Sequence, residues 1–312
     1  PPFEAAIEGD TLFGRAASDV KGAMATQVRL VPVLRELGWR PEGDVYVVGV
    51  VLEEVGGFGS QVLAQEMPTT SAVLAEATNN QLRRGHRGRA LVKVTFTGLS
   101  AHASAPDWAR NPHFAAARFL LEVERMPMVA HETFGSSTAA PTWIESDQES
   151  SNVTPATISV YLDWRNVPSE PLESILSRVR GIAEEVAHGL DGISATVEIS
   201  GREVTSYTGL TSTMPSTLAF ETPVDHPVLK KCRAALEATL GRPVTVDTWT
   251  FATDGGHLAK HGITTIGFAP GEERFAHTIH DQISLAKMTE ALAGNAALAM
   301  TLTRADDRQS QG

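Results

Sequence analysis

The chain has 312 residues and a hydrophobic fraction of 42%, which is enough to fill one large core or two ordinary ones. Its 37 acidic residues outnumber its 26 basic ones, and this net charge of -11 argues against nucleic acid as a partner, because phosphate binding requires a clustered positive surface. No apolar run approaches the roughly 20 residues that cross a bilayer, so we expect no membrane partner.

The first predicted element is a helix over residues 18–38. Apolar residues recur there at helical spacing and stop at Gly38, and Ser18 or Asp19 is placed to cap the start. Pro32 lies inside this stretch, so the sequence predicts a kink or a break there.

A continuous run of mainly β-branched residues follows at 45–52. Such a run is typical of a strand that is buried on both faces of a parallel sheet. A helix is predicted from about Gly59, and a second short strand at 72–75. Strand, helix and strand in this order predict an α/β core.

The pattern changes near Arg87, where apolar and polar residues begin to alternate over 90–97. The further elements predicted in this part of the chain are helices at 112–125 and 171–188 and strands at 157–163 and 195–200. Their order approaches that of a ferredoxin-like sandwich. We therefore expect an α+β domain at 87–203, inserted into an α/β domain built from 1–86 and 204–312.

The α/β pattern returns after the insertion. Its predicted elements are a helix at 226–240, strands at 244–248 and 264–268, and a helix at 284–304. Cys232 is the only cysteine and cannot form an internal disulfide. A lone thiol in a chain of this length fits a reducing compartment, so the expected location is the cytoplasm.

Five residues with metal-binding or acid–base side chains are predicted at one edge of the α/β sheet: Asp19, Glu53, Glu54, Glu76 and His277. Ligand sites form at such edges, where parallel strands end. Carboxylates gathered there repel, and burying each costs several kcal/mol unless cations neutralise them. Carboxylate and imidazole ligands suit zinc, and two metals about 3.5 to 4 Å apart would share a bridging carboxylate. The alternative is that each is an ordinary exposed acid.

Seven stretches of the sequence follow one another in this order: GRAASDVKGAMAT, LEEVGGFGS, AEATNN, GLSAHASAPDWARNP, SSNVTPATISVYLDWRNVP, WTFATDGGHL and IGFAPGEERFAHTIHDQI. Together they resemble the M20 metallopeptidase family, which includes acetylornithine deacetylase, succinyl-diaminopimelate desuccinylase, aminoacylase and the glutamate carboxypeptidases. Within the family, RGHRGR, SYTGL and WTFATDGG look most like a hydrolase branch associated with selenium and purine metabolism.

The resemblance implies a zinc-exopeptidase-like α/β catalytic domain with an inserted ferredoxin-like lid and dimerisation domain, and a homodimer. It implies that Asp19 bridges two metals and that Glu53 is the general base. Glu54 and His277 would complete the second metal site, with His280 as a rival to His277. Glu76 would bind the first metal, although Ala77-Thr78 follows it where the family has Pro-Thr.

One further ligand of the first metal is a histidine in a His-x-Asp motif, which the family's spacing places upstream of Pro1. The sequence as given would then hold one complete metal position and one incomplete one. We expect two zinc ions per chain in the full-length protein, with Co²⁺ or Mn²⁺ as alternatives.

Four residues are implied to handle the substrate. His102 would stabilise the oxyanion in the partner's active site; without the resemblance it would be read as a partly buried structural histidine. Asn152 and Arg165 would hold a substrate carboxylate, or Arg165 would pair with Asp163. Gly255 would lie near the substrate or form a simple tight turn.

A basic cluster of His86, Arg87 and Arg89 is expected to be a solvated hinge between the domains.

The predicted function is hydrolysis of an amide bond in a small carboxylate-bearing substrate such as an N-acyl amino acid. The alternatives are a dipeptidase or other exopeptidase, and a catalytically impaired relative that dimerises or binds a ligand.

Overall fold

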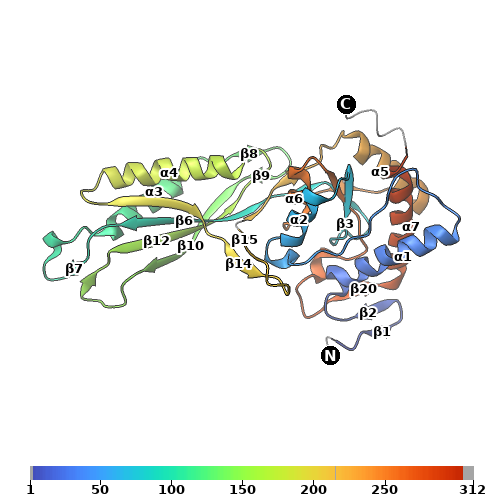
Figure 1. Ribbon diagram of the computed structural model, residues 1–312, viewed down its shortest axis with the longest axis horizontal. Helices are drawn as coiled ribbons and strands as arrows, with labels where there is room; N and C mark the ends of the chain where they lie inside the picture. The colour runs from blue at the N-terminus through green and yellow to red at the C-terminus, as the bar shows by residue number, and fades with distance from the viewer. Residues whose placement is uncertain (1–2, 215, 305–312) are drawn as a thin grey trace. The chain divides into compact units, whose positions relative to one another are not determined.

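The computed structural model describes residues 3–214 and 216–304, and it divides into two compact units (Figure 1). The first unit comprises Pro1–Glu53, Gly59–His86 and Phe220–Gly312. The second comprises Glu54–Phe58 and Arg87–Ala219. Residues 204–219 thus group with the second unit, where the sequence placed them with the first. Among the described residues, no helix has the length and apolarity that crossing a membrane requires.

The first unit is built on a four-stranded sheet in the order β18-β4-β19-β3. These strands are β3 (Ser71–Leu74), β4 (Leu82–Arg83), β18 (Val246–Asp247) and β19 (Thr264–Gly267). β3 and β19 are parallel, as are β18 and β4, while β19 and β4 are antiparallel. The sheet places Leu82 and Ile266 in a fully buried core that also contains Cys232.

Helices cover this sheet. They are α1 (Gly22–Glu36), α2 (Phe58–Glu66), α5 (Pro227–Leu240), α6 (Gly255–Lys260) and α7 (Leu285–Leu302). α5 and α7 lie side by side (Figure 1) and contribute Leu236 and Leu298 to the core. The shorter elements of the unit are β1 (Ala6–Glu8), β2 (Thr11–Phe13), β5 (Gly85–His86), β17 (Phe220–Glu221) and β20 (Gln282–Ser284), with the helical turns Ala17–Lys21 and Glu273–Phe275. A further helical turn, Glu53–Val55, begins at the end of a first-unit segment and continues into the segment Glu54–Phe58 of the second unit.

The second unit is an antiparallel sheet in the order β10-β12-β6-β13, with β16 (Ser216–Thr217) also paired to β6. The main strands are β6 (Arg89–Thr97), β10 (Thr138–Ser146), β12 (Thr157–Arg165) and β13 (Ser194–Ile199), and the helices are α3 (Pro112–Arg125) and α4 (Leu172–His188). The smaller elements are β7 (Ala101–His102), β8 (Ala130–His131), β9 (Gly135–Ser136), β11 (Val153–Thr154), β14 (Arg202–Thr205), β15 (Thr211–Met214) and the turn Pro106–Trp108.

Burial along β6 alternates residue by residue, which is the pattern of a strand with one covered face. The covered side chains of β6 include Val92, Val94 and Phe96, and they share a core with Phe119 of α3 and Val179 of α4. Figure 1 shows both helices on one side of this sheet. The predicted fold class, a mixed α/β chain with a second, α+β domain, is confirmed.

The prediction of a buried strand at 45–52 is wrong. No strand forms there, and large apolar side chains are exposed, including Tyr46 at 55% and Val51 at 49%. A strand buried on both faces needs a hydrogen-bonded neighbour, and in the described part of the chain the four-stranded sheet ends at β3.

The start of the first helix also differs from its prediction. α1 begins at Gly22, its N-cap is Lys21, and no side chain caps it. Ser18 does not serve as the cap because its hydroxyl donates to the carbonyl oxygen of Gln282, at 2.7 Å. α1 then continues through Pro32 without a break.

Candidate metal centre

Asp19 lies in the turn Ala17–Lys21, which precedes α1 and contains non-helical backbone at Asp19 itself, with φ -130° and ψ 86°. The buried carboxylate of Asp281 holds this turn. It accepts hydrogen bonds from the backbone N–H of Ser18, at 2.9 Å, and from that of Ala16. Asp19 is therefore presented by a turn that a distant part of the chain shapes.

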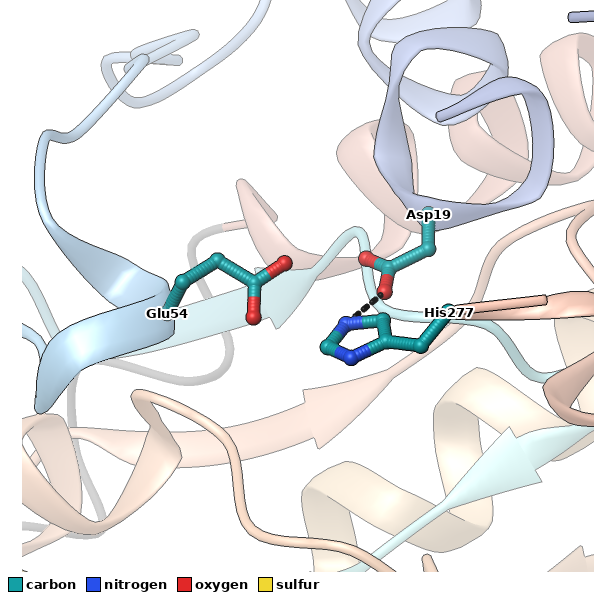
Figure 2. Close-up of side chains that lie close together, drawn as sticks. All are labelled: Asp19, Glu54 and His277. Atoms are coloured by element: carbon teal, nitrogen blue, oxygen red, sulfur yellow. Dashed lines mark ion pairs between the residues drawn. The ribbon is translucent and has the colours of Figure 1, made fainter. Parts of the chain in front are cut away.

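His277 follows the turn Glu273–Phe275 and adopts left-handed backbone, with φ 58°. This conformation costs a residue with a side chain about 1–3 kcal/mol and is concentrated at functional sites. The Nε2 atom of His277 lies 2.9 Å from Oδ2 of Asp19 (Figure 2). The His277 side chain is 66% exposed and that of Asp19 only 16%.

Glu54 completes a group of three. It lies in the turn Glu53–Val55, and one ligand atom from each of Asp19, Glu54 and His277 lies within 4.8 Å of the others. Figure 2 shows the Glu54 carboxylate directed toward the Asp19–His277 pair. Two carboxylates and an imidazole match the ligand types that zinc prefers.

The other predicted metal-site residues are placed as follows. Glu53 shares the turn of Glu54, and Glu76 follows β3 but is not a member of the group of three. The loop after Glu76 is firmly held, because the Thr78 hydroxyl donates to the Ala269 carbonyl oxygen and accepts from the Ala269 N–H, both at 2.9 Å. His280 is exposed and lies outside the group.

His102 is exposed at the end of β7, so it is not the partly buried structural histidine of the alternative interpretation. The Ser104 N–H donates to its Nδ1 at 3.2 Å, which leaves the proton of a neutral imidazole on Nε2. Asn152 is its neighbour, since the Asn152 carbonyl oxygen accepts from the Ala103 N–H at 2.9 Å.

Arg165 pairs with an acid at the end of β12, as the alternative predicted. Its Nε lies 2.6 Å from Oδ1 of Asp163, and Arg89 contacts the second oxygen at 2.9 Å. Burial raises the pKa of Asp163, but the hydrogen bonds from Arg165 and Arg89 outweigh it and hold the pKa below its usual value.

Gly255 is the first residue of α6 and is buried. A Cβ atom there would lie 2.3 Å from the Phe220 ring, so close packing requires glycine at this position.

His86 is also fully buried, against Phe220 and beside Thr253, so the prediction that it lies in a solvated hinge is wrong. Its burial follows from its place on β5, which pairs with β17.

Asp281 was not predicted as a site residue. Its contacts give it a role at the site, because it shapes the turn that presents Asp19.

Known proteins resemble this chain in sequence. A family model for the M20 peptidase dimerisation domain matches residues 84–191. The uncharacterised protein YgeY of Escherichia coli K12 is 28% identical over 309 residues, covering 96% of this chain and 75% of that protein. The succinyl-diaminopimelate desuccinylase of Gluconacetobacter diazotrophicus is 26% identical over 273 residues, covering 83% and 66%. The acetylornithine deacetylase of Myxococcus xanthus is 24% identical over 274 residues, covering 85% and 66%.

Solved structures share the fold. The aminopeptidase PepT of Bacillus cereus superposes with a TM-score of 0.74 at 20% identity, covering 96% of this chain and 76% of its own. The M20 family metallo-carboxypeptidase of Sulfolobus solfataricus has a TM-score of 0.64 at 14% identity, covering 97% and 80%. The resemblance to the M20 family is thus confirmed: this chain carries an M20 peptidase dimerisation domain, has desuccinylase and deacetylase homologues, and has the fold of M20 metallopeptidases.

Proposed function

We propose that this protein is a metal-dependent hydrolase that cleaves an amide bond in a small carboxylate-bearing molecule such as an N-acyl amino acid. The observation that carries this proposal is the group of Asp19, Glu54 and His277, whose ligand atoms lie within 4.8 Å of one another. The desuccinylase and deacetylase homologues support the reaction class. The full-length protein would form a homodimer through its dimerisation domain.

The donor set fits Zn²⁺, with Co²⁺ or Mn²⁺ as alternatives. Asp19, Glu54 and His277 would hold one metal, and Asp19 and Glu76 would hold a second. When bound, such metals polarise a carbonyl group and make water more acidic.

Glu53 is the proposed general base, because it shares a turn with Glu54 and adjacent residues direct their side chains differently. It would take a proton from the attacking water and return it to the leaving amine. His102, with its proton on Nε2, would donate to the developing oxyanion. Asn152 and Arg165 would hold the substrate carboxylate, with Arg165 exchanging Asp163 for the substrate.

The test compares Glu53→Gln with the wild type in the full-length protein, on N-succinyl and N-acetyl amino acids and on dipeptides. Loss of a general base should lower kcat roughly 10²- to 10⁴-fold. Glu66→Gln, at the exposed end of α2, is the control and should retain activity. Wild-type turnover by Glu53→Gln on every amide that the parent cleaves would overturn the assignment.

The substrate panel separates the alternatives. Faster release of amino acids from dipeptides than of succinate or acetate would identify an exopeptidase. A folded full-length protein that binds no divalent metal and hydrolyses none of these compounds would instead be a ligand-binding or dimerising relative.

A further inference from the structure

The loop that carries Glu53 and Glu54 is closed at its base. The Gly59 N–H donates to the Val51 carbonyl oxygen at 3.0 Å, so the chain entering the loop and the chain leaving it lie against each other. A Cβ atom on Gly59 would lie 2.6 Å from the Val51 nitrogen, so glycine permits this close approach. The position of helix α2 therefore determines where the loop begins and ends.

Two side chains on one face of α2 hold this helix. Ser60 and Ala64 are four residues apart and so lie above one another on the helix surface. Ala64 packs against Leu258 of α6 and against Ile263. Ser60 is 3% exposed, and its hydroxyl donates a hydrogen bond to Oδ2 of Asp254.

Asp254 stands at the N-cap of α6, yet its side chain makes no capping hydrogen bond. An aspartate at this position usually accepts from its own helix. Here Thr253 does so instead, since its Oγ1 accepts from the Gly255 N–H at 3.1 Å. Thr253 is in turn held by His86, whose Nε2 lies 2.9 Å from Oγ1 and accepts the Thr253 N–H at 3.0 Å. This arrangement releases the Asp254 carboxyl group for Ser60.

Burial of the Asp254 carboxyl group is energetically unfavourable. Asp254 is 5% exposed, and burial raises its pKa, opposed in part by the Ser60 hydrogen bond and by the charge of His257. A buried carboxyl group contributes less to stability than apolar packing of the same volume. Neither the proposed hydrolysis nor the capping of α6 accounts for this residue.

We propose that Asp254 is a positioning residue that fixes the start of α2 through Ser60 and thereby orients the loop carrying Glu53 and Glu54. The catalytic role of this loop rests on the proposed function. Its positioning by Asp254 does not depend on that function. Among the described residues, the side-chain hydrogen bond that joins Asp254 to α2 comes from the Ser60 hydroxyl, so we expect the effect to pass through that hydroxyl.

The test is hydrogen–deuterium exchange of the metal-free full-length protein. Ser60→Ala should make the backbone amides of residues 51–60 exchange roughly tenfold faster, because a buried hydrogen bond that holds the segment is lost. Thr222→Val is the matched control. It removes another buried hydroxyl, which donates to the Thr265 carbonyl oxygen at 2.6 Å in the same unit, and it should leave residues 51–60 unchanged.

Two changes at Asp254 complete the test. Asp254→Asn keeps an acceptor for Ser60 and should preserve slow exchange, whereas Asp254→Ala should match Ser60→Ala. In the metal-loaded enzyme, Ser60→Ala should lower kcat about tenfold with KM unchanged. Wild-type exchange over 51–60 in Ser60→Ala, or equal acceleration in Thr222→Val, would refute the proposal. Neither exchange result depends on whether the protein is a hydrolase.

Discussion

Buried acids are used differently in the two units. In the first unit, Asp281 accepts backbone N–H groups of the turn at Ala16 and Ser18, and Asp254 accepts the hydroxyl of Ser60. Asp281 thus holds the irregular turn that contains Asp19, and Asp254 holds the start of α2, which follows Glu53 and Glu54. The hydrogen-bond donors in these contacts are uncharged groups, namely two backbone N–H groups and one hydroxyl.

In the second unit the buried acid Glu170 has a cation. It is 1% exposed, accepts from the Trp164 indole N–H at 3.1 Å, and forms an ion pair with Arg178. The Arg178 guanidinium also lies over the Trp164 ring, 5.0 Å from its centre. The comparison suggests that acids in the first unit set the geometry of a site, while those in the second unit stabilise a domain.

The largest effect is expected from Glu170→Ala. It leaves the Arg178 charge and the Trp164 N–H without their buried partner, and should lower the free energy of unfolding by about 3 kcal/mol. Urea unfolding would measure this loss, with the exposed Glu184→Ala in α4 expected to stay within about 0.5 kcal/mol of wild type. Metal affinity should not change. If Glu170→Ala lost metal while the free energy of unfolding stayed unchanged, Glu170 would act on the site and not on the stability of its domain.

Asp281→Asn is expected to have a smaller effect, and this effect is on the free energy of metal binding. The change replaces one of the two Asp281 carboxylate oxygens, each of which accepts a backbone N–H of the Asp19 turn, with an amide NH₂ group that cannot accept. Groups that orient metal ligands typically contribute 10- to 100-fold in metal affinity, so we expect weakening of about that size. Competition with a chromophoric chelator would measure it, with exposed Asp225→Asn as the control. Unchanged affinity would show that the turn holds without Asp281.

The smallest expected effect is the contribution of Asp254 to the pH dependence of the free energy of unfolding. Its folded-state pKa is raised above 3.8 by burial, so the folded state binds the proton more tightly than the unfolded state. Stability from this group is therefore greatest at low pH and is lost as pH rises through the folded pKa. Asp254→Asn should gain stability relative to wild type over that window, measured by urea unfolding from about pH 4 to about pH 8. A difference independent of pH would contradict the account.

The second unit was largely predictable from sequence, because its strands carry the alternation that one covered face imposes. The run at 45–52 has stronger β propensity than β6, yet it forms no strand. Propensity records how a residue fits a pleated surface, whereas strand formation depends on a neighbouring backbone. Sequence pattern near 45–52 contains no information about that neighbour.

The candidate site was predictable as residue types but not as geometry. The resemblance pointed to Asp19, Glu54 and His277, and the structure brings these three together. The contacts of Asp281 and Asp254 could not be predicted, since they join segments 263 and 194 residues apart in the chain. Hydrogen bonds over such separations follow from the tertiary fold and leave no local pattern.

The zinc content of the full-length protein measures whether Asp19, Glu54 and His277 hold a divalent metal. His277→Ala and His280→Ala would be compared with wild type by elemental analysis after equilibration with Zn²⁺. We expect His277→Ala to lose about one equivalent of zinc per chain and His280→Ala to retain the wild-type content. Equal zinc content in His277→Ala and wild type would show that His277 is not a metal ligand.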